Sequence, residues 1–323
     1  MRALWVLLAA APVYAAITGT VINQSTGKPQ AGATVAFYRV ATATGPELIE
    51  QAKSDAQGNF TINQTAQGPS LIRTAFDGVT YNHMLPPGRP TTGLTIDVYN
   101  ASKSPGEAKV TKHMILFEPG GGQVAVTETY LFNNTGKTAW NDPDLGTLKF
   151  AIPQGASKPT VQATAPGGLP LGAAVSRNPR TEAYFVDFAI KPGETRFDVS
   201  YSAPYTEGAD YTGKVLTKDE NTYLIVPNGV NIKGENLSDL GNEPRTQAHI
   251  YGLSGAAFKI QMSGAAAGAP TETDADSDSG PKIEQILPRV NTQAKLIIGL
   301  ALGILALGFA VLYRATPSSR GGA

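Results

Sequence analysis

The sequence predicts an all-β protein, with two antiparallel β-sandwich domains in tandem and one C-terminal transmembrane helix. Apolar residues recur with a period of two in every strong segment between residues 16 and 263, which is typical of half-buried strands. Glycine (35) and proline (23) are frequent among the 323 residues, and only 16% of the residues are charged. This composition favours short strands joined by many turns. A long apolar segment near the C-terminus predicts the helix.

The two ends of the chain predict an exported and anchored protein. A basic start and an apolar run lead to Val13 and Ala15, so we expect residues 1–15 to be a cleaved signal peptide. Residues 295–313 are apolar after the first lysine and would form a helix of about 27 Å, long enough to cross a bilayer. Residues 314–323 would then be a cytoplasmic tail. The predicted location is the cell membrane, with the N-terminal domains in the periplasm or at the cell surface.

The membrane segment leaves two alternatives open. Residues 287–292 (LPRVNT) resemble a Leu-Pro-x-Thr-Gly sorting motif without its Thr-Gly, so a retained anchor is favoured over processing before the helix. Gly299 and Gly303 have the Gly-x-x-x-Gly spacing that lets two helices approach closely, which makes helix pairing a hypothesis. This spacing is common by chance in apolar segments, and a simple anchor is the preferred interpretation.

The segment after the signal peptide contains ordered turn motifs. A β-branched stretch from Ile17 to Ile22 predicts a strand, and the glycines that follow fit turns and bends. The motifs are Gly19-x-Val21, Gly27-x-Pro29-x-x-Gly32-Ala33-x-Val35 and Asp55-x-x-Gly58-x-Phe60. On these residues, the region 16–100 resembles the carboxypeptidase regulatory-like family. The resemblance implies a small transthyretin-like, carbohydrate-binding-like β-sandwich that serves as a spacer, docking or binding unit and has no zinc ligands.

A polar stretch, residues 100–107, marks a predicted boundary before a second β-sandwich domain at 105–263. This region is similar to the second domain of uncharacterised bacterial membrane-anchored proteins that begin with the same module, which implies no known activity. Residues 264–294 are rich in Gly, Ala, Pro and acidic residues, so we expect a flexible linker. The acidic run Asp274-x-Asp276-x-Asp278 lacks the EF-hand glycine and glutamate positions, and weak calcium binding there stays an open alternative.

Composition argues against several classes of function. The chain has 26 basic and 26 acidic residues, so it has no net field that would attract nucleic acid, and we expect no nucleic-acid partner. Cysteine is absent, which excludes disulfides and Cys-type zinc sites. His83, His113 and His249 stand in no metal-binding spacing, so we expect no metal and no cofactor. His113 starts a strand pattern and is expected to be partly exposed.

Glu128 is the one unusual polar residue in a predicted strand. Val124, Val126, Tyr130 and Phe132 share one face of the strand 123–132, and Glu128 interrupts that face. A satisfied structural carboxylate, bound by Lys, Arg or backbone amides, is the simpler interpretation. The alternative is a ligand- or partner-binding site, for which Glu128, His113 and Trp140 are the candidates. Scattered aromatic residues could stack on sugars or simply pack: Tyr38, Tyr81, Trp140, Tyr205 and Tyr211.

Three functions are compatible with these observations. The preferred one is a non-enzymatic single-pass envelope protein that presents two extracytoplasmic sandwiches for contact with other envelope proteins or for complex assembly. A carbohydrate- or cell-wall-binding membrane protein is the first alternative, and an unrecognised hydrolase is the second. A pocket that joins His113 or His249 to a carboxylate would favour the hydrolase. A cluster of exposed coplanar aromatic residues would favour glycan binding.

Overall fold

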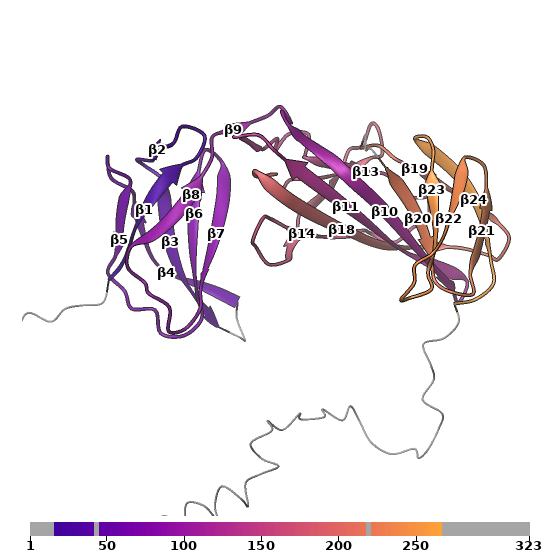
Figure 1. Ribbon diagram of the computed structural model, residues 1–323, viewed down its shortest axis with the longest axis horizontal. Helices are drawn as coiled ribbons and strands as arrows, with labels where there is room; N and C mark the ends of the chain where they lie inside the picture. Colours follow the sequence, from indigo (N-terminus) through magenta and orange to yellow (C-terminus); the bar gives the residue numbers. More distant parts are fainter. Residues whose placement is uncertain (1–15, 42–44, 218–220, 267–323) are drawn as a thin grey trace, which may run out of the picture. The chain divides into compact units, whose positions relative to one another are not determined.

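The computed structural model describes residues 16–41, 45–217 and 221–266, and every regular element in these ranges is a β-strand (Figure 1). Most neighbouring strands pair antiparallel, and the predicted all-β fold class is confirmed. Within these ranges no helix has the length and apolarity that crossing a bilayer requires. The predicted signal peptide, the transmembrane segment with Gly299 and Gly303, and nearly all of the linker lie outside the described residues.

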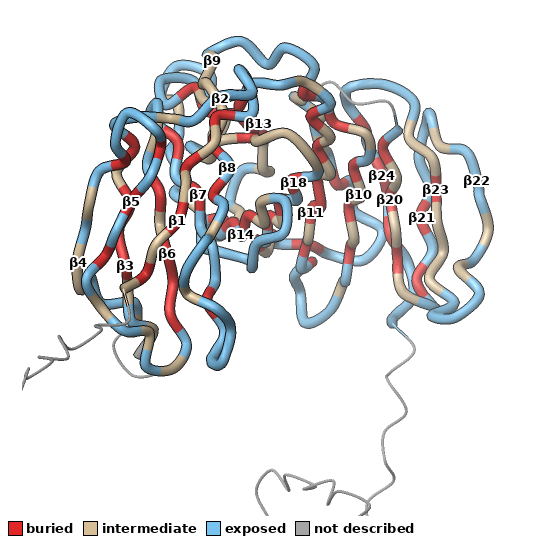
Figure 2. Tube along the Cα trace, turned by 60° about the vertical axis from the view of Figure 1, so that its left-hand side comes forward, coloured by how far each residue is buried: buried red, intermediate tan, exposed pale blue. Residues whose placement is uncertain are grey.

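The first β unit consists of two four-stranded sheets. In one sheet β1 (Ile17–Asn23) pairs antiparallel with β2 (Lys28–Pro29) and β5 (Asn59–Ile62), and parallel with β8 (Leu94–Val98). The other sheet is antiparallel and has the order β4 (Gly45–Lys53), β3 (Thr34–Ala41), β6 (Ser70–Phe76) and β7 (Val79–Leu85). Buried and more exposed positions alternate along β1, as the period of two predicts (Figure 2). Alternate side chains of both sheets meet in one hydrophobic core.

Residues of the turn motifs have local structural roles in this unit. Gly27 and Gly58 have φ values of 70° and 77°, which favour glycine. Asp55 Oδ1 accepts hydrogen bonds from the amides of Gln57 and Asn59, and the loop so formed leads into β5. Phe60 follows in β5 and is only 3% exposed. The motif therefore closes a turn and places an aromatic residue in the core.

The second β unit is built on an eight-stranded sheet. Its strands, from one edge to the other, are β15 (Leu171–Ala173), β14 (Thr160–Thr164), β18 (Gly193–Pro204), β11 (Gln123–Asn134), β10 (Ala108–Gly120), β20 (Thr222–Val226), β23 (His249–Leu253) and β22 (Leu237–Asn242). The hairpin of β10 and β11 turns at Gly121 and Gly122, which both have positive φ. The two long strands of this hairpin carry the residues of the candidate site.

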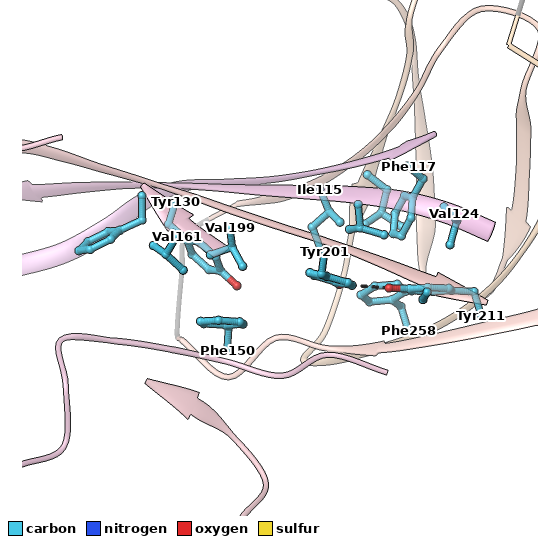
Figure 3. Packing of buried hydrophobic residues seen from close by; sticks show 14 of the residues in the cluster. Ile115, Phe117, Val124, Tyr130, Phe150, Val161, Val199, Tyr201, Tyr211 and Phe258 are labelled. Carbon is cyan, nitrogen blue, oxygen red and sulfur yellow. Dashed lines mark hydrogen bonds between the residues drawn. The ribbon is translucent and has the colours of Figure 1, made fainter. Parts of the chain in front are cut away.

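Two small sheets cover the inner face of the eight-stranded sheet. One contains β13 (Leu148–Phe150), β17 (Tyr184–Val186) and β16 (Val175–Arg177), and the other contains β19 (Asp210–Lys214), β24 (Ala257–Ser263) and β21 (Asn231–Gly234). Their side chains pack with the inner residues of the large sheet in a second hydrophobic core. In this core Phe258 and Tyr211 lie beside Phe117 (Figure 3).

An irregularity in β10 changes which side chains face inward. The register with β11 shifts between Val110 and Lys112, so that Thr111 is an extra residue in the strand. Before this bulge Val110 is buried, and after it His113 is buried, although the two residues are an odd number of positions apart. Because strict alternation would point these two side chains to opposite faces, the bulge is what brings His113 into the core.

The segment that connects the two β units forms hydrogen bonds with both of them. β9 (Ala101–Ser102) pairs parallel with β12 (Ala139–Trp140). The Asn100 amide donates to Ser25 Oγ at 2.9 Å, and Lys191 Nζ donates to the Thr80 carbonyl at 2.5 Å. The polar stretch 100–107 therefore includes a short paired strand, and the described residues group as one compact unit.

Candidate functional site

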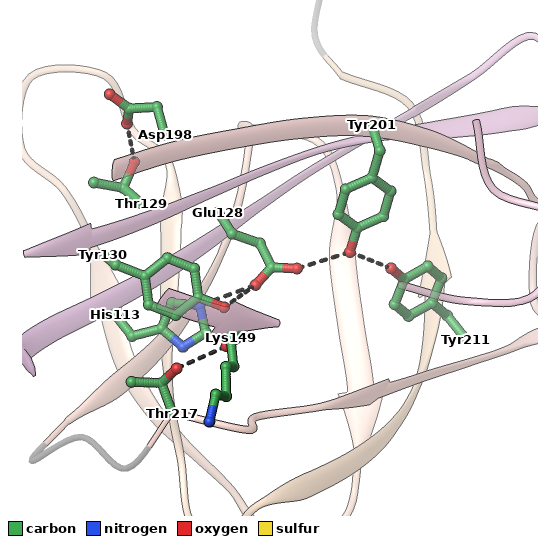
Figure 4. Close-up of polar contacts among 9 residues, drawn as sticks. All are labelled: His113, Glu128, Thr129, Tyr130, Lys149, Asp198, Tyr201, Tyr211 and Thr217. Carbon is green, nitrogen blue, oxygen red and sulfur yellow. Dashed lines mark hydrogen bonds and ion pairs between the residues drawn. The ribbon is translucent and has the colours of Figure 1, made fainter. Parts of the chain in front are cut away.

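Glu128 and His113 meet in the core of the second β unit. His113 Nε2 lies 3.1 Å from Glu128 Oε2, and the Tyr130 hydroxyl donates to the same oxygen at 2.6 Å (Figure 4). The His113 ring stacks on Tyr130, with 3.9 Å between ring centroids. His113 is fully buried and Glu128 is 4% exposed. The expectation that His113 is partly exposed is therefore wrong, and the bulge at Thr111 is the reason.

A chain of hydroxyl groups extends from the other carboxylate oxygen. The Tyr201 hydroxyl donates to Glu128 Oε1 at 2.9 Å and lies 3.1 Å from the Tyr211 hydroxyl. Because Tyr201 has one hydroxyl proton and gives it to Glu128, Tyr211 must donate to Tyr201. Burial, together with the nearby Glu128, raises the pKa of both tyrosines, so both stay protonated donors. The network runs from β11 through β18 to β19 on the opposite sheet.

The arrangement of this cluster indicates a structural role. Glu128 is satisfied, as the simpler interpretation of the sequence expected, but its partners are a histidine and two tyrosines in place of Lys, Arg or backbone amides. A carboxylate in an apolar core is tolerated only when its oxygens accept hydrogen bonds. Here both oxygens do so, and the cluster links the two facing sheets by polar contacts.

Trp140 lies apart from this cluster. Its indole Nε1 donates to the Lys103 carbonyl at 3.2 Å, and its ring packs 6.3 Å from Phe132. The structure therefore does not combine Trp140 with Glu128 and His113 in one site. Of the other aromatic candidates, Tyr81, Tyr205 and Tyr211 are buried, which leaves no ring face for a sugar.

The remaining histidines and Tyr38 lie near the surface. His249 Nε2 is 2.7 Å from Asp239 Oδ1, and its ring stacks on Tyr251. The Gly241 amide and His249 together lower the pKa of Asp239. His83 lies on an exposed position of β7, and the Tyr38 ring lies 4.8 Å from the Arg73 guanidinium. Among the described residues no group of three or more His, Asp or Glu side chains could hold a metal ion.

The outer face of the eight-stranded sheet changes character halfway across. One cross-strand row runs over six strands in the order Thr160, Ser200, Thr127, Leu116, Ile225 and Ile250. The first three residues carry hydroxyl groups, and the last three are apolar and half-buried. Met114, in the neighbouring row, adds to the apolar half. We name Met114, Leu116, Ile225 and Ile250 the outer apolar strip.

An open hollow lies beside this strip, over the start of β20, the end of β23 and the first part of β22. Its volume is about 720 Å³. Its lining contains Val215, Leu216, Thr217, Asn221, Thr222, Tyr223, Ser238, Leu240, Gly252, Leu253, Ser254, Gly255 and Ala256. Two histidines contact carboxylates in the structure, His113 with Glu128 and His249 with Asp239. Neither pair lines this hollow.

Sequence reasoning singled out Glu128 and missed the outer apolar strip. The outer apolar strip could have been found from Met114, Leu116 and Ile225, which are apolar at positions between inward-facing residues of the same strands. Which strands neighbour one another was the missing information, since β10 pairs with β20 across more than a hundred residues of sequence.

No family model matches the chain, and no curated protein matches it. A solved structure of a variant M1 zinc metallopeptidase from Deinococcus radiodurans, bound to a Tyr-Ser-Ala substrate, is similar with a TM-score of 0.29 and 8% sequence identity. The match covers 48% of this chain and 42% of that chain, so the chain spans less than half of the enzyme's length.

Proposed function

We propose that this chain is a non-enzymatic, single-pass envelope protein whose two β-sandwich domains, 16–100 and 105–263, bind other envelope proteins outside the membrane. In this proposal residues 1–15 are removed on export, residues 295–313 anchor the chain, and the first domain is a carboxypeptidase regulatory-like unit. The basic start, the apolar C-terminal segment and the ordered turn motifs of the sequence support these parts.

The outer apolar strip is the observation that carries the proposal. An antiparallel sheet that covers a core on one side usually presents polar residues on the other. Here Thr127 and Ser200 follow that rule, while Leu116, Ile225 and Ile250 in the same row depart from it. Contiguous apolar residues on an outer surface are typical of protein contact sites.

Co-purification of the full-length chain from its own membranes tests this function. A partner should be recovered with the unchanged chain and lost from Ile225→Lys, which places a charge in the strip. Ser200→Lys places the same charge in the polar half of the same row and should keep the partner. A partner that is retained by Ile225→Lys, or lost equally from both variants, would contradict the proposed surface.

Export and anchoring have a separate test. Mass spectrometry of the mature protein should find Ala16 as the first residue, together with intact residues 295–323. A mature protein that keeps residues 1–15, or that ends before residue 295, would contradict the proposed topology while leaving the binding surface open to its own test.

A further inference from the structure

The antiparallel sheet of the first β unit also presents an apolar row on its outer face. The row crosses β4, β3, β6 and β7 in the order Leu48, Tyr38, Leu71 and Met84. Phe37 and Ile72, which neighbour Tyr38 and Leu71 in sequence, belong to the core, so the side chains of the row point to the opposite face. Leu48 is 49% exposed and Met84 is 42% exposed, so both ends of the row are open to solvent. The outer face of such a sheet usually carries polar residues, and this row departs from that rule.

The charged residues beside this apolar row are positive. The next row on the same face consists of Gln51, Ala36, Arg73 and Asn82, and the row after it consists of Lys53, Thr34, Ala75 and Thr80. Arg73 and Lys53 are the charged residues of these rows, so an acidic group that approaches this face gains a favourable interaction. The β3–β4 hairpin continues for three residue pairs beyond the apolar row, to Ala41 and Gly45, so all three rows lie within the described, paired part of the sheet.

Arg73 is held in place by uncharged neighbours. Its Nε donates to Asn82 Oδ1 at 3.2 Å, and its guanidinium carbon lies 4.8 Å from the centre of the Tyr38 ring. These contacts orient the guanidinium without neutralising its charge. A guanidinium that is already oriented can accept a carboxylate through two parallel hydrogen bonds with little further loss of side-chain entropy. Because Tyr38 belongs to the apolar row, the row and the fixed positive charge form one continuous surface.

The spacing of this surface indicates the shape of its partner. Strands lie about 4.8 Å apart, so the apolar row is about 14 Å long, which equals about ten residues of an α-helix. Neighbouring rows on one face lie about 7 Å apart along the strands, within the width of a helix with its side chains. We propose that this face binds an amphipathic helix of a partner protein, with the apolar stripe of the helix on the row and its acidic flank on Arg73 and Lys53. This surface goes beyond the outer apolar strip, which lies on another sheet in the second β unit.

Binding of a synthetic helical peptide to the full-length chain tests the proposal. The peptide has about 15 residues, with leucines at the i, i+3, i+4 and i+7 spacing and glutamates on the flank. A matched peptide keeps the leucines and has lysine in place of each glutamate. Fluorescence anisotropy measures both labelled peptides against the chain in a zwitterionic detergent. We expect the glutamate peptide to bind at least about tenfold more tightly than the lysine peptide.

Charge variants locate the peptide on this face. Arg73→Gln should weaken binding of the glutamate peptide about fivefold, and Met84→Glu, which places a negative charge in the row, should weaken it about tenfold. Lys53→Gln, at an exposed position of β4, leaves the contacts of Tyr38 intact and should weaken binding about twofold. Arg180→Gln removes the same charge from an exposed position in the second β unit and should leave binding unchanged.

Three results would overturn the proposal. They are no binding of the glutamate peptide, equal binding of the two peptides, and losses from Arg73→Gln and Lys53→Gln no larger than the loss from Arg180→Gln. Thermal unfolding of each variant shows that the compared proteins are folded. Because Ile225→Lys changes the second β unit and leaves this face unaltered, loss of a partner from that variant and loss of peptide binding are separate outcomes.

Discussion

The hydroxyl of Tyr211 on β19 lies 3.1 Å from the hydroxyl of Tyr201 on β18, and this contact connects two facing sheets through the core of the second β unit. The Tyr201 hydroxyl donates a hydrogen bond to Glu128, which also contacts His113 and Tyr130. The core therefore has a polar bridge whose members come from four strands.

Replacement of Glu128 should strongly destabilise the protein. Glu128→Ala leaves the buried His113, Tyr130 and Tyr201 without their shared acceptor, and we expect the free energy of unfolding to fall by about 3 kcal/mol. Glu128→Gln keeps the shape and one acceptor oxygen, so the loss should be about half as large. Urea unfolding of purified protein measures both changes. Glu118→Ala, on an exposed position of the same hairpin, is the control and should change stability by less than about 0.5 kcal/mol.

The two tyrosines of the bridge should differ in their effects. Tyr201→Phe removes a donor to the carboxylate, and hydrogen bonds to charged groups contribute about 2 kcal/mol. Tyr211→Phe removes only a donor to a neutral hydroxyl, so it should cost about 1 kcal/mol. The same unfolding measurement compares them. A larger loss from Tyr211→Phe would contradict donation from the Tyr211 hydroxyl to Tyr201.

Gly213 should not accept a side chain. A Cβ atom there would lie 2.1 Å from Phe258 Cζ, and the Phe258 ring is held by contacts with Phe117 and Tyr211. Gly213→Ala should therefore lower the free energy of unfolding by about 2 kcal/mol through overpacking. Gly172→Ala, in the edge strand β15, meets no atom within 4 Å and should be nearly neutral. Equal stability of the two variants would contradict the packing of Phe258.

Lys191 should make stability depend on pH. Burial lowers the pKa of Lys191 to about 8, from its ordinary value of 10.5, at a position where its Nζ lies 4.7 Å from the centre of the Tyr81 ring. Between about pH 8 and pH 10.5 the unfolded chain therefore binds more protons than the folded chain, so this residue makes stability rise with pH. Above about pH 10 the buried tyrosines, whose pKa values are raised, act in the opposite direction.

Thermal unfolding between about pH 7.5 and about pH 9.5 tests this dependence, because the tyrosine contribution is small in that interval. The unchanged chain should become more stable across the interval, and Lys191→Met should lose that increase. Lys112→Met, at an exposed position of β10, should retain it. An identical pH profile for the unchanged chain and Lys191→Met would contradict the burial of this amine.

Part of the fold could be predicted from the sequence. The strand β1 begins at the predicted Ile17 and ends one residue later than predicted, and β11 begins at the predicted Gln123 and ends two residues later. β4 and β7 were missed because most of their residues are exposed, so they show no clear alternation. Short strands such as β15 and β16 were missed for the same reason, since they do not bury one regular face.

The candidate site was less predictable than the fold. Glu128 stood out because it interrupts an apolar face, a signal that is local in sequence. Its partners did not stand out, because His113 depends on a bulge at Thr111 and Tyr201 lies 73 residues further along the chain. The outer apolar strip depends on the parallel pairing of β10 with β20, which no local pattern shows.

Site-specific photo-crosslinking in the native membrane tests the central claim most directly. A photo-reactive phenylalanine analogue replaces either Ile225, in the outer apolar strip, or Ser200, in the polar half of the same row. The account predicts a reproducible adduct with one envelope protein from position 225 and none from position 200. Adducts of equal yield from both positions, or no protein adduct from position 225, would contradict the claim that this strip is a protein-binding surface.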